Sequence, residues 1–210
     1  MTDAAARDAL CRLGHSLFER GLTHGSTGNL SIRTDTGFLM TPTGSSLGAL
    51  DPARLAALDA TGLHVRGDPP TKEALLHLAM YRERSCDRAV VHLHSTHSVA
   101  VSVLADADPA NVLPVLTAYY AMRIGTLPLV PYFAPGDAAL ADAVAGFASR
   151  HHAVLLANHG PVVSGTSLDA AADAIEELEA TAKLWLLVRH ENVRPLDATA
   201  LADIARRFPR

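Results

Sequence analysis

Ala89-Val-Val-His-Leu-His-Ser95 is the stretch that decides how this chain folds and where its chemistry lies. Its run of β-branched and apolar residues predicts a buried strand. Side chains two residues apart on a strand point to the same face, so His92 and His94 share the face of Val90. Two imidazoles on one rigid strand can begin a zinc site, and a pair of structural histidines is the alternative.

Helical and strand-like segments alternate on both sides of this strand. Apolar spacing predicts helices over residues 3–20, 71–84, 96–105, 118–124, 137–150 and 168–190, with Thr71 and Ser167 as caps. Strands are expected over residues 30–33, 37–42, 111–115 and 126–133, after the turn at Asp51-Pro52, and as a pair within 152–165. Mixed strands and helices around one core predict an α/β or α+β fold, preferably a three-layer sandwich.

Composition is consistent with one folded domain over residues 1–210. The chain is 49% hydrophobic and 19% charged, which is enough apolar material for a substantial core. No repeat, low-complexity tract or linker divides it.

Charge and composition also exclude several classes of function. A net charge of −4 and 5% aromatic residues argue against nucleic-acid binding. No stretch approaches the length of a membrane span, and the N-terminus lacks a hydrophobic signal core. We therefore expect a soluble, cytoplasmic protein in which Cys11 and Cys86 are reduced thiols.

Two more residues extend the histidine pair into a candidate metal site. Glu73 lies early in a helix, where the dipole favours a carboxylate, although alone it could be a capping or solvated acid. His159 lies in Asn-His-Gly-Pro, directly after a buried strand. One carboxylate and three imidazoles together match a zinc ligand set, and three histidines would remain if the glutamate were displaced.

Five motifs occur in an order that points to a known family. They are GSTGNLS (25–31), TPTG (41–44), GDPPTKE (67–73), HLHSTHS (92–98) and NHGPVVSG (158–165). With them, the chain resembles the class II aldolase/adducin family over roughly residues 5–190. Together with EELEATAKL (176–184), the motifs are most similar to those of the 3-oxo-tetronate 4-phosphate decarboxylases.

This resemblance implies both a fold and an activity. The fold would be a three-layer α/β/α sandwich with a central mixed, mainly antiparallel sheet. The activity would be metal-dependent decarboxylation of 3-oxo-tetronate 4-phosphate to dihydroxyacetone phosphate and CO2 through a metal-stabilised enediolate. Zn²⁺ is the leading metal, with Mn²⁺ or Co²⁺ possible, and homotetramers with active sites between subunits are implied.

The resemblance also assigns a phosphate site made of backbone amides and hydroxyls. The matching positions are Thr27, Gly28, Asn29, Thr43, Gly44, Thr71 and Lys72. Glycines let backbone N–H groups approach an anion, although each loop alone would be an ordinary turn and Lys72 could equally stay solvated.

Proton transfer has two candidates. Glu73 could act as acid or base. The family's aldolases use a tyrosine from a neighbouring subunit as proton donor, and Tyr119 falls near that position. Tyr120 remains an alternative to Tyr119, and either could be an interface or core residue. Arg123 could pair with the substrate carboxylate.

Two other histidines near the motifs have less definite roles. His77, one helical turn beyond Glu73, could orient the site or simply pack against the strand. His97, at the start of the helix after that strand, could support the ligands from outside.

The same residues bear on three other functions. A class II aldolase or epimerase acting on a deoxy- or pentulose phosphate needs the same metal and phosphate sites. A non-catalytic adducin-like interaction module would have lost the ligands, all four of which are present. A metalloprotease is excluded because Glu73 and His77 do not form the HExxH motif.

Overall fold

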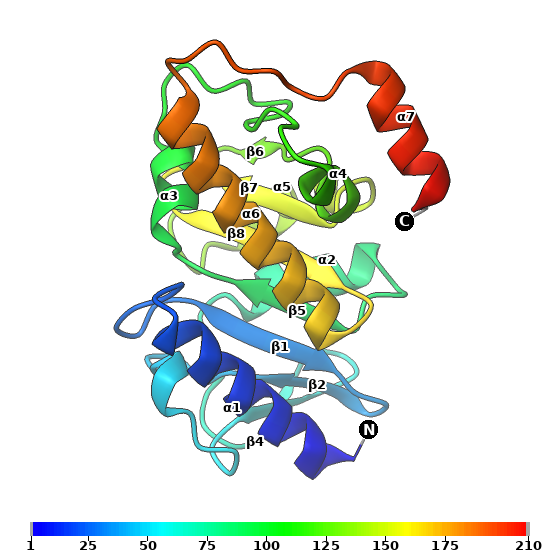
Figure 1. The fold of residues 1–210 in the computed structure, drawn as a ribbon. Coiled ribbons are helices and arrows are strands. Elements are labelled where there is room, and N and C mark those ends of the chain that lie inside the picture. The colour runs from blue at the N-terminus through cyan, green and yellow to red at the C-terminus, as the bar shows by residue number, and fades with distance from the viewer. Residues whose placement is uncertain (1, 209–210) are drawn as a thin grey trace.

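A single eight-stranded sheet forms the middle layer of the molecule, as Figure 1 shows for a computed structural model that describes residues 2–208. In spatial order the strands are β4 (His64–Arg66), β3 (Ala56–Asp59), β2 (Gly37–Met40), β1 (Asn29–Arg33), β5 (Ala89–His92), β8 (Gly160–Gly165), β7 (Ala153–Leu156) and β6 (Leu129–Val130). Only β6 and β7 pair in parallel, and the other neighbours are antiparallel. The sheet is therefore mixed and mainly antiparallel, as predicted.

Helices cover both faces of this sheet. One face carries α1 (Asp3–Glu19), α3 (Thr96–Ser102), α4 (Ala118–Arg123) and α6 (Leu168–Val188), and the other carries α2 (Ala74–Glu83) and α5 (Ala138–Ala148). A 3-10 turn, η1 (Leu47–Ala49), packs on α1, and α7 (Ala198–Arg207) lies at the C-terminal end. This arrangement confirms the three-layer α/β/α sandwich.

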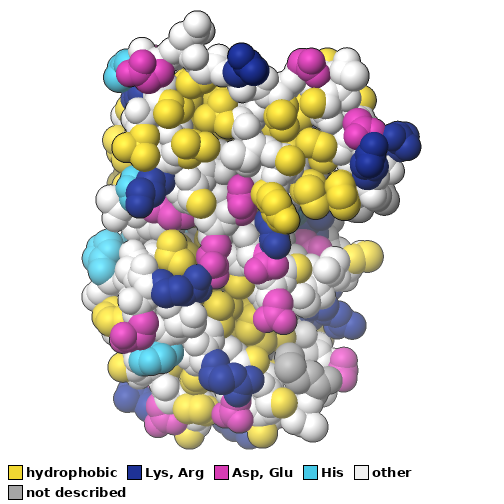
Figure 2. All heavy atoms as spheres, viewed as in Figure 1, with side chains coloured by type: hydrophobic (Ala, Val, Ile, Leu, Met, Phe, Trp, Pro, Cys, Tyr) yellow, Lys and Arg dark blue, Asp and Glu magenta, His cyan; other side chains and the backbone are white. Residues whose placement is uncertain are grey.

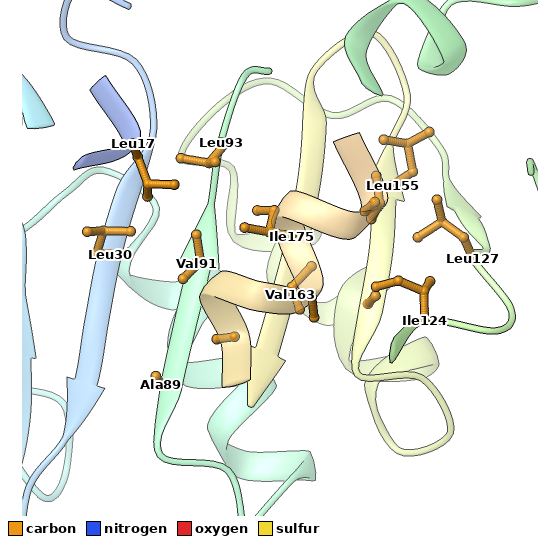
Figure 3. Close-up of a cluster of buried hydrophobic side chains, with 14 of the residues drawn as sticks. Leu17, Leu30, Ala89, Val91, Leu93, Ile124, Leu127, Leu155, Val163 and Ile175 are labelled. Carbon is orange, nitrogen blue, oxygen red and sulfur yellow. The ribbon is translucent and has the colours of Figure 1, made fainter. Parts of the chain in front are cut away.

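The alternation of side chains along the strands divides the core between the two faces. On β5, Val91 contributes to the cluster formed with α1 and α6, which Figure 3 shows in close-up. Val90 points the other way, into the cluster under α2 and α5. His92 therefore follows Val90 toward the α2 face.

Helix starts largely follow the capping rules. The side chain of Ser167 accepts a hydrogen bond from the backbone N–H of Ala170, and Asp137 caps α5 in the same way. The prediction that Thr71 caps α2 is wrong, because that helix begins at Ala74 with Glu73 at the N-cap. Thr71 instead accepts a 3.3 Å hydrogen bond from the N–H of Glu73.

Three further differences from the sequence predictions concern strands and the C-terminal helix. The expected strand over residues 111–115 does not form, because it contains Pro114 and its Val112 N–H donates to the Leu127 carbonyl outside any ladder. Strand β5 ends at His92, so His94 lies just beyond it. Neither β4, which is fully exposed, nor α7, which has no buried residue, was predicted.

Within residues 2–208, no helix has the combined length and apolar character that crossing a bilayer would need.

Candidate metal centre

Four potential ligands converge at one end of the central strands. His92 ends β5, His94 follows two residues later, and His159 lies in the turn between β7 and β8. Glu73 comes from the N-cap of α2, on the same face of the sheet as His92. One ligand atom from each of the four side chains lies within 4.8 Å of every other.

The spacing of the three imidazoles matches a metal site. The Nε2 atom of His92 lies 3.1 Å from that of His94 and 3.3 Å from that of His159, and the remaining pair is 3.1 Å apart. Ligands placed 2.0–2.1 Å from a tetrahedral zinc are separated by about 3.3 Å. Because three ring nitrogens cannot all hydrogen-bond to one another, a shared cation explains these contacts better.

The backbone fixes which nitrogen of His92 faces the centre. Its Nδ1 lies 2.8 Å from the carbonyl oxygen of Pro161, which can only accept a hydrogen bond. The ring proton therefore resides on Nδ1, and the lone pair of Nε2 points at the cluster. This is the usual arrangement for a histidine that binds a metal.

Glu73 completes the set with a carboxylate that is only 6% exposed. Its Oε2 accepts a 2.8 Å hydrogen bond from Asn29 Nδ2 and lies 3.3 Å from His92 Nε2. Its Oε1 lies 3.2 Å from His159 Nε2, yet is buried without a hydrogen-bond partner among the described residues. One anionic oxygen and three neutral imidazoles are a donor set that fits a divalent cation.

Two glycines allow the backbone to bring these ligands together. Gly28 adopts φ +78°, and a Cβ there would come 3.0 Å from the carbonyl oxygen of His92. A Cβ on Gly160 would lie 2.2 Å from the carbonyl oxygen of Leu93. Any larger residue would therefore push the strand ends, and the ligands they carry, apart.

Burial keeps the imidazoles ready to bind metal. Desolvation, reinforced by repulsion from His92, lowers the pKa of His94 to about 3, and the same causes lower that of His159 to about 4. Burial acts to raise the pKa of Glu73, but attraction to His92 and the hydrogen bond from Asn29 outweigh it and lower that pKa to about 2. At neutral pH, His94, His159 and Glu73 are therefore unprotonated.

These depressed pKa values predict that the metal-free protein loses stability in acid. In the unfolded chain a histidine binds its proton near pH 6.5, whereas folded His94 and His159 bind theirs only near pH 3–4. The unfolded state therefore takes up more protons as the pH falls below about 6.5, and the free energy of unfolding decreases. Thermal unfolding of chelator-treated protein should show Tm falling steadily from pH 7 to pH 4.5. A flat profile, or one unchanged in His94→Ala, would contradict this.

A cavity of about 250 Å³ opens directly onto the cluster. All seven residues expected to bind phosphate line it, together with three of the metal-site residues: Thr27, Gly28, Asn29, Thr43, Gly44, Thr71, Lys72, Glu73, His94 and His159. A second cavity of about 530 Å³ shares His94 and His159 and is bordered by His24 and Tyr132. A larger one, of about 710 Å³, lies between α2 and α5 and includes none of the four ligands.

The order of the motifs, the sandwich and the Glu/His₃ cluster agree with one family model. Residues 8–186 match the class II aldolase and adducin N-terminal domain. The chain belongs to the class II aldolase and adducin family.

Its relatives within this family include named enzymes. The chain is 46% identical to a 3-oxo-tetronate 4-phosphate decarboxylase of Haemophilus influenzae, covering 99% of both chains, and 48% identical to one of Escherichia coli K12, covering 96% of both. An E. coli crystal structure described as a putative aldolase/epimerase/decarboxylase superposes with a TM-score of 0.94, at 47% identity over 96% of this chain and 98% of that one. An L-fuculose phosphate aldolase of E. coli K12 is 34% identical over 79% of this chain and 75% of its own length.

Three other candidate site residues lie apart from the cluster in this chain. Tyr119 is 60% exposed on α4 and does not line either cavity beside the cluster. Tyr120 is fully buried beneath it. Arg123 forms a 2.6 Å ion pair with Asp173 of α6, so its charge is already engaged.

Glu179 is a residue that the sequence reasoning missed. This α6 carboxylate is 8% exposed and accepts four hydrogen bonds from the start of α3: the N–H and Nδ1 of His97 and the N–H and Oγ of Ser98. Burial acts to raise its pKa, but these donors outweigh burial and lower it. Since α3 follows His94 closely, Glu179 fastens the segment that carries His94. Its partners lie more than 80 residues away in the chain, and no local motif could reveal them.

Replacing Glu179 with alanine should destabilise the protein by about 3 kcal/mol, because several buried donors would lose their acceptor. For a chain of this size that corresponds to a decrease in Tm of roughly 6–12 °C. The matched control is Glu176→Ala on the same helix, which removes only the more exposed pair with Arg20 and should cost less than about 1 kcal/mol. Equal Tm values for the two variants would show that the α3 bonds contribute nothing.

Proposed function

We propose that this chain catalyses the metal-dependent decarboxylation of 3-oxo-tetronate 4-phosphate to dihydroxyacetone phosphate and CO2. The observation that supports this best is the Glu/His₃ cluster, which borders a cavity lined by Gly/Ser/Thr loops and Lys72. The substrate is inferred from relatives named for this reaction, which are 46–48% identical over nearly the whole chain.

The reaction suits such a site because the substrate is a β-keto acid. When the bond between C1 and C2 breaks, CO2 leaves and the electron pair remains on C2, where it delocalises into the C3 carbonyl. The resulting enediolate takes a proton at C2 and becomes dihydroxyacetone phosphate. The barrier depends on stabilising the negative charge that develops on the substrate oxygens.

Glu73, His92, His94 and His159 would hold the metal, for which Zn²⁺ is the first candidate and Mn²⁺ or Co²⁺ are alternatives. When bound, the cation supplies Lewis-acid stabilisation of the developing negative charge. The imidazoles are held by strand ends and stay in place, whereas Glu73 stands at a helix N-cap. It is therefore the ligand best placed to exchange with substrate and to move a proton.

The phosphate would lie in the cavity of about 250 Å³ beside the cluster. Gly28 and Gly44, at φ +78° and +70°, would offer backbone N–H groups, and Thr27, Thr43 and Thr71 would add hydroxyls. Lys72 supplies an exposed positive charge at the rim. The Asn29 side chain is already bonded to Glu73, so it would contribute to phosphate binding only through its backbone.

Tyr119 is the second proposed proton donor, and its exposure supports a role in the active site of another subunit. Apolar side chains gather over the upper half of the face in Figure 2, where Figure 1 shows α4 and α6. Tyr119, Leu184 and Leu187 are exposed on these elements. We propose a homotetramer in which this surface is covered.

We further propose that residues 1–210 work as a single domain, since all the described strands form one sheet. A cytoplasmic location would suit the two free cysteines, Cys11 and Cys86, and a charged phosphate-ester substrate.

A coupled assay for dihydroxyacetone phosphate tests the reaction. Purified protein is given each C2 epimer of 3-oxo-tetronate 4-phosphate, with and without chelator, and CO2 is measured in parallel. We expect equal amounts of the two products from one epimer, lost with chelator and restored by Zn²⁺, Mn²⁺ or Co²⁺. No CO2 from either epimer at any metal concentration would refute the proposal.

The second candidate is a sugar-phosphate aldolase or epimerase, favoured by the L-fuculose phosphate aldolases among the relatives. It would use the same cluster and cavity. Release of an aldehyde from a ketose 1-phosphate, without CO2, would identify it. A protein that binds neither metal nor phosphate ester would instead be a non-catalytic adducin-like module.

A further inference from the structure

A ladder of buried polar side chains joins β1 to α2 behind the metal centre. Asn29 and Ser31 project from β1, and Glu73, His77 and Tyr81 project from α2 and its N-cap; we call these five residues the polar ladder. Each is at most 7% exposed. Four helical residues rise about 6 Å and two strand residues advance about 6.7 Å, so the steps of the two elements match.

Every rung of the polar ladder is a hydrogen bond. The hydroxyl of Tyr81 lies 2.8 Å from Ser31 Oγ, which lies 2.7 Å from His77 Nδ1. On the other side of the ring, His77 Nε2 lies 2.5 Å from Asn29 Oδ1. Asn29 then donates from Nδ2 to Glu73 Oε2 at 2.8 Å.

The acceptor at one end sets the direction of the whole series. The carboxylate of Glu73 can only accept, so Asn29 must turn its NH₂ group toward it and its carbonyl oxygen toward His77. That carbonyl oxygen needs a donor, which places the ring proton of His77 on Nε2. Nδ1 then accepts from Ser31, and Ser31 accepts from Tyr81.

Apolar side chains surround the polar ladder, so contact with solvent does not explain why polar residues occupy these positions. Leu76, Met80 and Val90 pack around it in the apolar cluster under α2. Apolar side chains could fill the same volume without the cost of burying five polar ones. Both ring nitrogens of His77 are used within the polar ladder, Nε2 toward Asn29 Oδ1 and Nδ1 toward Ser31 Oγ.

We propose that His77 is a positioning residue for the metal centre: by donating to the Asn29 carbonyl, it holds the Asn29 NH₂ group on Glu73 and so fixes the carboxylate facing the three histidines. Without this donor, the Asn29 amide would be free to turn its oxygen toward Glu73 and repel it. The inference rests on the metal centre proposed above, and it is independent of which substrate the centre serves.

Cobalt binding to the chelator-stripped protein tests this without any substrate. Co²⁺ titrations, followed by the visible ligand-field absorption, report both affinity and ligand geometry. His77→Leu should weaken Co²⁺ binding about 10–100-fold and alter the spectrum. His77→Gln, whose side-chain amide can still donate to Asn29, should stay within about threefold of wild type.

A double-mutant cycle asks whether His77 acts through Asn29. Asn29→Ala removes the donor to Glu73 directly and should weaken Co²⁺ binding to a similar extent. In that background, His77→Leu should cause no further loss of affinity. Additive losses would mean that His77 influences the metal by some other route and would overturn the proposal.

A control separates positioning from general stability. Thr181→Val removes a buried hydroxyl from α6, which covers the opposite face of the sheet from α2. This variant should lower Tm without changing Co²⁺ affinity or spectrum. If His77→Leu does not fold, Asn29→Ala and His77→Gln carry the test, since the first must lose affinity and the second must retain it.

The outcomes distinguish this inference from the proposed function. Wild-type affinity and spectrum in a folded His77→Leu protein would refute the positioning role alone. Tight Co²⁺ binding without CO2 release would refute the decarboxylase assignment but not the positioning role of His77. A wild-type protein that binds no Co²⁺ would refute the metal centre, and the positioning role with it.

Discussion

Replacing His94 with alanine is expected to lower kcat/KM for decarboxylation by at least about 10³-fold, equivalent to roughly 4 kcal/mol of transition-state stabilisation. His94 supplies one of three imidazole nitrogens that stand 3.1–3.3 Å apart, and the remaining ligands cannot enclose a cation in the same way. Bound metal, measured by elemental analysis after gel filtration, should fall well below one per chain. Circular dichroism should remain that of the wild type, since His94 lies outside β5 and is only partly buried.

The matched control for this variant is His64→Ala. His64 is exposed on the edge strand β4, and its ring lies within hydrogen-bond distance of the carbonyl of Arg66. It should keep wild-type turnover and metal content. A His94→Ala protein that also kept both would remove His94 from the ligand set.

Glu73→Gln is expected to lower kcat by about 10²–10⁴-fold even when metal is saturating, because the glutamine can neither accept nor return a proton. The substitution preserves the shape of the side chain, and its amide oxygen can still accept from Asn29 Nδ2. Binding of metal should weaken because an anionic ligand becomes neutral. Measuring kcat across a metal titration separates the two effects.

Full turnover with full metal content in Glu73→Gln would rule out Glu73 as the acid or base. Turnover that recovers completely at high metal concentration would leave Glu73 as a ligand only, and Tyr119 would become the proton donor. Tyr119→Phe provides the comparison, since it lies outside the cluster of its own chain.

The sequence was most informative where chemistry depends on near neighbours in the chain. The i, i+2 spacing of His92 and His94 placed both imidazoles on one side, and the structure brings their Nε2 atoms to 3.1 Å even though β5 ends at His92. The cap of α6 was similarly local and was predicted correctly from Ser167. Glu73 and His159 were assigned mainly from the family resemblance, because no local sequence pattern indicates that α2 and the β7–β8 turn lie together.

What remained hidden depends on contacts across the fold or on elements without a buried face. Glu179 and the polar ladder join residues 44 to 82 positions apart, and their hydrogen bonds follow from layer packing alone. Strand β4 is exposed throughout, so its residues carry no alternating pattern to read. The start of α2 was placed too early because Thr71 resembles a cap, whereas the chain makes one more turn before the helix begins.

The order of the ligands along the chain has a consequence for when the protein can acquire its metal. Glu73, His92 and His94 come early, whereas His159 follows His94 by 65 residues and reaches the cluster only after β7 and β8 have joined β5. At about 5–20 residues per second, a ribosome needs roughly 3–13 s to make that interval. During this time the growing polypeptide lacks one of the four proposed ligands, so we expect metal to bind only after His159 has been made and β7 and β8 have joined the sheet.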